Sequence, residues 1–123
     1  MILIEKINDE IHEHYTGNQK LFPNAIPYDE NALPDVEFRN AWDLVNGVVS
    51  IEFSKAKEIK KQSLRQQRVG LLEAQDVAFQ RALESSSDTT SIVGEKIRLR
   101  NITMLVDIAE SVSDLKAINI SKN

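Results

Sequence analysis

Helical periodicity dominates residues 54–103, where apolar side chains recur at intervals of three and four. Such spacing places them on one face of a helix. Ser54 is predicted to cap the first turn with its hydroxyl, strong helix formers follow it, and no proline occurs after it. The predicted apolar stripe consists of one row with Val69, Leu72, Phe79 and Leu83 and a second row with Leu64, Leu71, Ala78 and Ala82.

The polar run at residues 85–88 is predicted to end this helix. Asp88 can cap a second helix, whose apolar residues are Ile92, Leu99, Ile102, Val106 and Ala109. Because the connection is short, the two helices are expected to pack antiparallel. Residues 111–114 resemble a capping box and predict a short helix that continues to Ile118.

Asp76 interrupts the apolar face of the first predicted helix, between Leu72 and Phe79. A carboxylate at such a position is costly unless it is paired. Arg100, on the flank of the second helix, is the predicted partner, and Arg68 is the alternative. A catalytic acid would need a second acid, a histidine or a nucleophile nearby in the pattern. The prediction is therefore a structural ion pair between Asp76 and Arg100 that sets the register of the two helices and is costly to break.

Residues 38–53 carry the clearest local signal of the chain, two apolar runs separated by Asn46 and Gly47. This dipeptide favours a type I′ turn, in which both central residues need positive φ, and so predicts a β-hairpin. Trp42 is expected to be a core anchor. An isolated hairpin is marginal in water, and the helical pair that follows is the predicted cover.

The first 37 residues are predicted to form an extended strap. Residues 1–11 fit either a short strand that pairs with a partner or a helical face, and residues 16–37 contain all three prolines and many turn formers. A long loop rich in apolar residues is more often an interaction segment than a passive connection. Its apolar residues need a cover, which a surface of the chain itself or of a partner would supply. The predicted partner-binding residues are Leu21, Phe22, Ile26, Tyr28 and Leu33.

Together these patterns predict an α+β protein. An N-terminal extended strap and a β-hairpin are followed by an antiparallel α-helical hairpin and a short C-terminal helix. Two domains are predicted, a proline-containing interaction arm at residues 1–37 and a β-hairpin plus helical-hairpin domain at residues 38–123.

Composition narrows the chemistry of this 123-residue chain. It has no cysteine, so disulfides, thiolate metal sites and cysteine nucleophiles are excluded. His12 and His14 would share a strand face, but no third metal ligand is evident. The start of the chain lacks the features of a signal peptide, and no stretch approaches the roughly 20 apolar residues of a membrane span. We therefore predict no metal, no cofactor and no membrane partner.

The net charge of −4 is unevenly distributed. Residues 1–53 carry three Lys or Arg and ten Asp or Glu, whereas residues 54–123 carry twelve and nine. The basic start of the first long helix could neutralise phosphates, but no aromatic residue is interleaved and the whole chain is acidic. A solvated helix face is preferred to a nucleic-acid site, and attraction between the two halves, within or between copies, leaves a homo-oligomer open.

The run FRNAWDLVNGVVSIEFSKAKEIKKQSLRQQRVGLLEAQDVAFQRALE, followed by EKIRLRNIT and SVSDLKAI, resembles a family of small tailed-bacteriophage proteins encoded among tail genes. The resemblance covers about two-thirds of the chain, from Phe38 on. The usual Asp after the second-helix Arg is Asn101 here. The matching positions are Phe38, Trp42, Lys55, Ala56, Ile59, Arg65, Arg68, Leu71, Leu72, Asp76, Leu99, Arg100, Leu115, Lys116 and Ala117.

This resemblance implies a non-enzymatic tail-associated structural protein that binds another tail, fibre or baseplate protein in the virion. The alternative is a tail-fibre assembly chaperone that acts in the host cytoplasm and is absent from the mature particle. An enzyme would need a nucleophile with a base, a metal cluster or a Gly-rich phosphate loop, and the sequence shows none of these. A basic-helix regulator that binds nucleic acid is the weakest reading.

Overall fold

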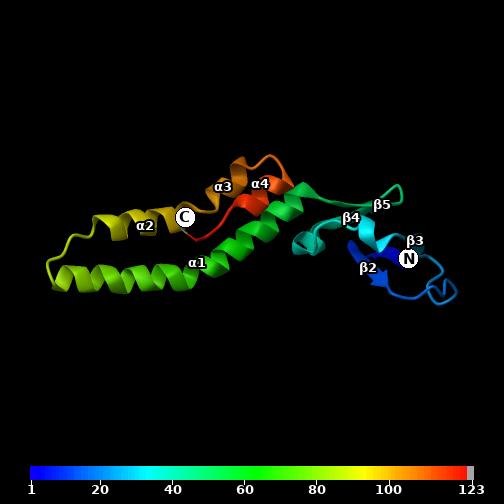
Figure 1. Cartoon of the computed structure of the whole chain (residues 1–123), viewed down its shortest axis with the longest axis horizontal. Helices are drawn as coiled ribbons and strands as arrows, with labels where there is room; N and C mark the ends of the chain where they lie inside the picture. The colour runs from blue at the N-terminus through cyan, green and yellow to red at the C-terminus, as the bar shows by residue number, and fades with distance from the viewer. Residues whose placement is uncertain (122–123) are drawn as a thin grey trace. The chain divides into compact units, whose positions relative to one another are not determined.

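The computed structural model describes residues 1–121 and confirms the predicted α+β class (Figure 1). Short strands and 3₁₀ helices occupy the N-terminal part of the chain, and helices occupy the rest. The chain divides into two compact units, Met1–Ile59 and Lys60–Asn123. Each unit is described by itself below.

A three-stranded antiparallel sheet forms the start of the first unit. The central strand β1 (Ile2–Ile7) lies between β2 (Glu10–His14) and β3 (Ile26–Tyr28). Asn8 and Asp9 connect β1 to β2 and both have positive φ, as a two-residue type I′ turn requires. The strand alternative for residues 1–11 is therefore confirmed, and its pairing partners are strands of the same chain.

The predicted hairpin forms between β4 (Trp42–Val45) and β5 (Val48–Ile51). Asn46 and Gly47 have φ values of 53° and 78°, so the predicted turn is confirmed. Two 3₁₀ helices, η1 (Glu30–Ala32) and η2 (Val36–Ala41), connect β3 to this hairpin. The carboxylates of Asp29 and Asp35 cap them, each by accepting a hydrogen bond from a backbone N–H two residues later.

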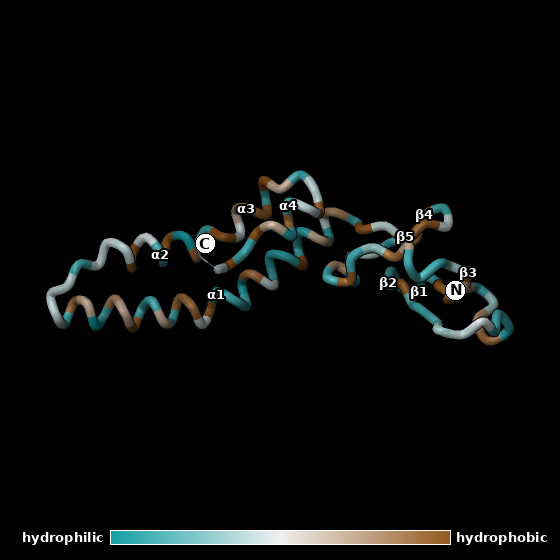
Figure 2. The backbone as a smooth tube through the Cα atoms, in the orientation of Figure 1, coloured by the Kyte–Doolittle hydropathy of each residue, from teal (hydrophilic) through white to brown (hydrophobic). Residues whose placement is uncertain are grey.

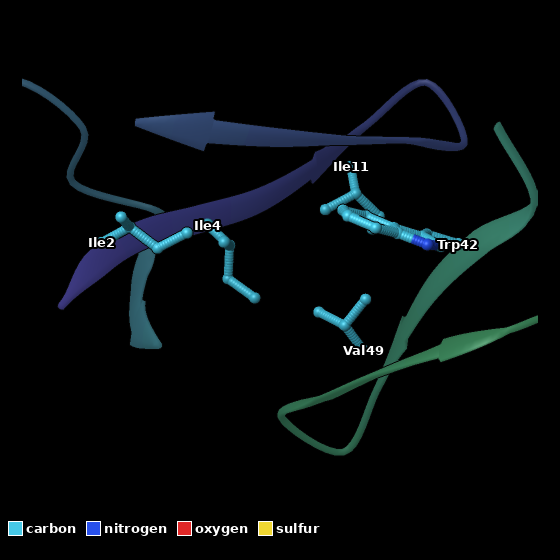
Figure 3. Packing of buried hydrophobic residues seen from close by; sticks show 5 residues of the cluster. All are labelled: Ile2, Ile4, Ile11, Trp42 and Val49. Carbon is cyan, nitrogen blue, oxygen red and sulfur yellow. The ribbon is translucent and has the colours of Figure 1, made fainter. Parts of the chain in front are cut away.

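The hydrophobic core of the first unit joins the sheet to the hairpin (Figure 3). Trp42 is a core anchor, as predicted, and its Nε1 donates to the Asp35 carbonyl oxygen at 3.2 Å. The Tyr28 hydroxyl accepts from the Val49 N–H at 3.1 Å. The predicted cover was wrong, because the N-terminal strands pack against the hairpin within this unit. The buried cluster consists of Ile2, Ile4, Ile11, Trp42 and Val49.

The predicted domain boundary after residue 37 is also wrong. The first 37 residues supply three strands and part of the core, so they belong to the same unit as the hairpin. An ion pair between Lys6 Nζ and Asp43 Oδ1, at 2.8 Å, links β1 to β4. This contact raises the pKa of Lys6 and lowers the pKa of Asp43, because each charge stabilises the other.

The long helix α1 (Phe53–Glu84) begins one residue before the predicted cap. Glu52 caps it in place of Ser54, since its carboxylate accepts from the Lys55 N–H at 3.1 Å and from the Ser54 hydroxyl. The helix ends at the predicted polar run in a Schellman arrangement. Ser86 has a φ of 56°, and the Ser87 N–H donates to the Ala82 carbonyl oxygen at 2.8 Å.

Three shorter helices follow in the second unit, α2 (Thr90–Asn101), α3 (Met104–Ile108) and α4 (Val112–Ala117). The predicted cap Asp88 lies one residue before the N-cap position of α2, which Thr89 occupies, and its carboxylate accepts from the Thr90 N–H at 2.9 Å. Residues 102–103 interrupt the predicted second helix and separate α3 from α2. The Ser111 hydroxyl accepts from the Asp114 N–H at 3.1 Å, which confirms the predicted start of α4.

The core of the second unit draws on both predicted rows of α1. In the second row Leu64 and Ala82 are buried but Leu71 is 42% exposed. In the first row Leu72 and Phe79 are partly buried, whereas Val69 and Leu83 are exposed. Residues 61, 68 and 76 of α1 contact residues 107, 100 and 96 of the returning helices, respectively. The partners' numbers fall as those on α1 rise, which confirms the antiparallel hairpin. The buried apolar residues of this unit are Leu64, Ala82, Leu99, Ile102, Val106, Ala109 and Leu115.

Candidate interaction surface

Asp76 does form an ion pair between α1 and α2, but the predicted partner was wrong. Its Oδ1 lies 2.7 Å from the Nζ of Lys96 on α2. The Asp76 side chain is 60% exposed and the Lys96 side chain 17% exposed. The Lys96 ammonium also lies 5.0 Å from the centroid of the Phe79 ring, in a cation–π contact. Lys96 is therefore held between a carboxylate and an aromatic face of α1.

The electrostatics of Asp76 follow from this geometry. The hydrogen bond from Lys96 lowers the pKa of Asp76 below its ordinary value, and the more distant charge of Arg100 acts in the same direction. Arg100 takes part in the helix pairing through its backbone, since its carbonyl oxygen accepts from Arg68 Nη1 at 2.9 Å. The Asp76 carboxylate is largely exposed, so the ion pair of Asp76 with Lys96 contributes less to stability than the buried pair predicted from the sequence.

The basic first half of α1 is engaged in structural contacts. Lys61 Nζ lies 2.6 Å from Asp107 Oδ1, and the Lys57 ammonium lies 5.0 Å from the centroid of the Phe53 ring. Lys60 is 9% exposed. These contacts reduce the number of cations on α1 that face solvent, which favours the structural reading of this basic stretch.

Most of the predicted partner-binding residues contact their own unit. Ile26, Tyr28 and Leu33 are partly buried against the core cluster of the first unit. Phe22 stacks on the His14 ring, with 3.6 Å between ring centroids and an interplanar angle of 9°. Leu21 is the exception among the five, with 64% of its surface exposed. Four of the five therefore have contacts within their own unit, and a docking role for the set stays a prediction.

The histidine segment makes structural contacts on β2. His14 Nε2 lies 2.9 Å from Glu5 Oε1. Glu13, whose side chain is 4% exposed, pairs with Arg39 at 3.0 Å and accepts from the Tyr15 hydroxyl. Within residues 1–121, no group of three or more His, Asp or Glu side chains is arranged to hold a metal ion.

An apolar groove in the second unit is the candidate interaction surface. It has a volume of about 430 Å³ and is lined by α3, α4 and the residues that follow α4. Its exposed apolar side chains are most prominent on α3, where Ile108 is 74% exposed and Leu105 is 44% exposed. The hydropathy colouring of Figure 2 shows this hydrophobic stretch at α3. The lining residues are Leu105, Ile108, Ala109, Asp114, Ala117, Ile118, Asn119 and Ser121.

The periodicity argument missed this groove because it followed a single apolar row. Val106 and Ala109 belong to the predicted row and are buried. Met104, Leu105 and Ile108 lie off that row, and one short helix cannot bury apolar residues on all of its sides. The excess of apolar residues at positions 102–109 is the signal that could have revealed an exposed apolar surface.

Two further findings bear on the class of protein. Among residues 1–121, no helix has both the length and the apolar composition that a membrane crossing requires. Comparison with known proteins found no matching family model, no matching curated protein and no matching solved structure.

Proposed function

We propose that this chain is a non-enzymatic bacteriophage tail-associated structural protein that binds another tail, fibre or baseplate protein in the virion. The observation that carries the proposal is the exposed apolar groove of α3 and α4. Exposed apolar surface next to polar residues is typical of a protein–protein contact. The resemblance of residues 38–118 to small phage tail proteins supplies the biological setting.

The polar clusters also support a binding role. Asp76 pairs with Lys96, Glu13 with Arg39 and His14 with Glu5, and each pair joins two elements of the fold. Because these polar side chains are engaged within the chain, the exposed apolar surface is the better candidate for the proposed contact. The site of the proposed contact is accordingly the groove, in place of the N-terminal segment expected from the sequence.

Mass spectrometry of purified phage particles from the source genome tests this proposal. A structural role predicts the chain at stoichiometric amounts relative to known tail proteins. The chaperone alternative predicts that particles lack the chain while it co-purifies with a fibre protein from lysate. Absence from both samples would contradict the tail assignment itself.

A further inference from the structure

The α3–α4 groove combines apolar lining with a local negative charge. Residues 60–103 of the second unit carry eight Lys or Arg and five Asp or Glu. Residues 104–121, which form the groove and its surroundings, carry one Lys and three Asp or Glu. The groove therefore lies in an acidic segment of an otherwise basic unit.

Three carboxylates lie in this segment, Asp107, Glu110 and Asp114. Asp107 pairs with Lys61 Nζ at 2.6 Å, so Glu110 and Asp114 are the two that can meet charges of a partner. Asp114 is a lining residue, and its Oδ2 accepts from the Glu110 N–H at 2.9 Å. Glu110 is exposed on the connection between α3 and α4. Glu110 and Asp114 follow Ile108 by two and six residues in the sequence. At physiological ionic strength, exposed charges interact over roughly 8 Å, so these carboxylates act on the charges of a partner that lie beside them.

From this juxtaposition we infer that the groove binds a segment of another protein that carries apolar anchor side chains flanked by Lys or Arg. An apolar anchor removes the surface of Ile108 and Leu105 from water, which is favourable. Basic flanking residues meet Glu110 and Asp114, and such complementarity selects the partner and its orientation. The inference deepens the proposed function, on which it rests for the identity of the partner as a tail protein.

Charge also argues against two other occupants. Groove-to-groove pairing of two copies would bring the Glu110 and Asp114 carboxylates of both copies together, and like charges in an interface are unfavourable. The first unit of a second copy is no better, because residues 1–59 carry five Lys or Arg and eleven Asp or Glu. Nucleic acid would be repelled by the same carboxylates.

Binding of designed peptides to the full chain tests the inference. The probes are two fluorescent helical peptides with the same leucine anchors, one flanked by lysines and one by glutamates, measured by anisotropy at low and moderate salt. The lysine-flanked peptide is expected to bind at least tenfold more tightly, and added salt should reduce this preference. Equal affinities, or binding of neither peptide, would overturn the inference.

Matched variants locate the binding site. Ile108→Ala should lower the affinity for the lysine-flanked peptide by about tenfold. Ile97→Ala removes an exposed isoleucine outside the groove lining and should change this affinity little. Glu110→Lys should reverse the preference between the peptides, and Glu73→Lys on α1 should leave it unchanged. All four positions are exposed, so the variants should retain the wild-type circular dichroism spectrum. Equal losses in Ile108→Ala and Ile97→Ala would contradict the assignment.

Sedimentation of the same proteins tests whether a second copy of the chain occupies the groove. A dimer that is lost in Ile108→Ala but kept in Ile97→Ala would assign the groove to self-association and overturn the inference. The peptide measurements are independent of the virion experiment. If the chain binds the lysine-flanked peptide selectively but is absent from particles, the inferred binding preference of the groove stands and the proposed role in the virion is rejected.

Discussion

Gly70 lies in the interior of α1, far from either end of this 32-residue helix. It is exposed, and among the described residues none places an atom within 4 Å of the position that an alanine Cβ would take, neighbouring helix backbone aside. Glycine in a helix interior is unfavourable because it loses more backbone freedom on folding than any other residue. Gly70→Ala should therefore stabilise the protein.

The size of the effect follows from helix propensity and chain length. Glycine is less favourable than alanine in a helix interior by about 1 kcal/mol. With an unfolding entropy of about 2.1 cal/mol/K per residue, a single transition of the whole chain gives a Tm increase of about 4 °C. If residues 60–123 unfold as a separate transition, the same free energy raises the Tm of that transition by about 7 °C.

Thermal unfolding followed by helical circular dichroism measures this change. Ala74→Gly is the matched control, since Ala74 is also exposed in the interior of α1 and the reverse change should lower the Tm by a similar amount. An unchanged or lower Tm for Gly70→Ala, together with a lower Tm for Ala74→Gly, would refute the reasoning. That combination would mean that the folded chain makes a close contact at Gly70 which a methyl group disturbs.

Three further predictions concern other parts of the fold. Leu99→Ala should cost about 2–5 kcal/mol in urea unfolding because Leu99 is fully buried, and a loss within about 0.5 kcal/mol would match an exposed residue instead. Gly47→Ala should cost about 1–2 kcal/mol because its φ of 78° is unfavourable for alanine; unchanged stability would contradict the turn. Asp76→Asn should destabilise at pH 7, and the difference should vanish as the pH falls well below 3.8, since the pKa of Asp76 is lowered by Lys96 in the folded state. A pH-independent difference would show that the ion pair with Lys96 is not its cause.

Local patterns predicted the elements whose causes are local. The Asn46–Gly47 turn, the end of α1 after Glu84 and the cap at Ser111 all depend on a few adjacent residues, and all are present. Two local errors remain. Residues 102–103 interrupt the predicted second helix, and at the start of α1 the carboxylate of Glu52 accepts from the Lys55 N–H in place of the predicted cap at Ser54. A carboxylate one residue before the helix prevailed there over a hydroxyl inside it.

Long-range pairing could not be predicted in the same way. Helical spacing brought both Lys96 and Arg100 toward α1, one turn apart, and the offset between two helices decides which of them reaches Asp76. The apolar residues of the N-terminal segment were recognised as needing a cover. Only the packing of β3 and the hairpin showed that Ile26, Tyr28 and Leu33 find this cover within their own unit.

The sequence by itself determined the α+β class, the hairpin turn and the antiparallel helices, because periodicity and turn chemistry act over a few residues. The tertiary structure decided which residues of the two apolar rows are buried. Two rows of α1 compete for one neighbour, and α3 carries more apolar residues than the core can cover. The surplus at Leu105 and Ile108 lines the groove, a feature that depends on how the helices pack and not on the pattern of any one of them.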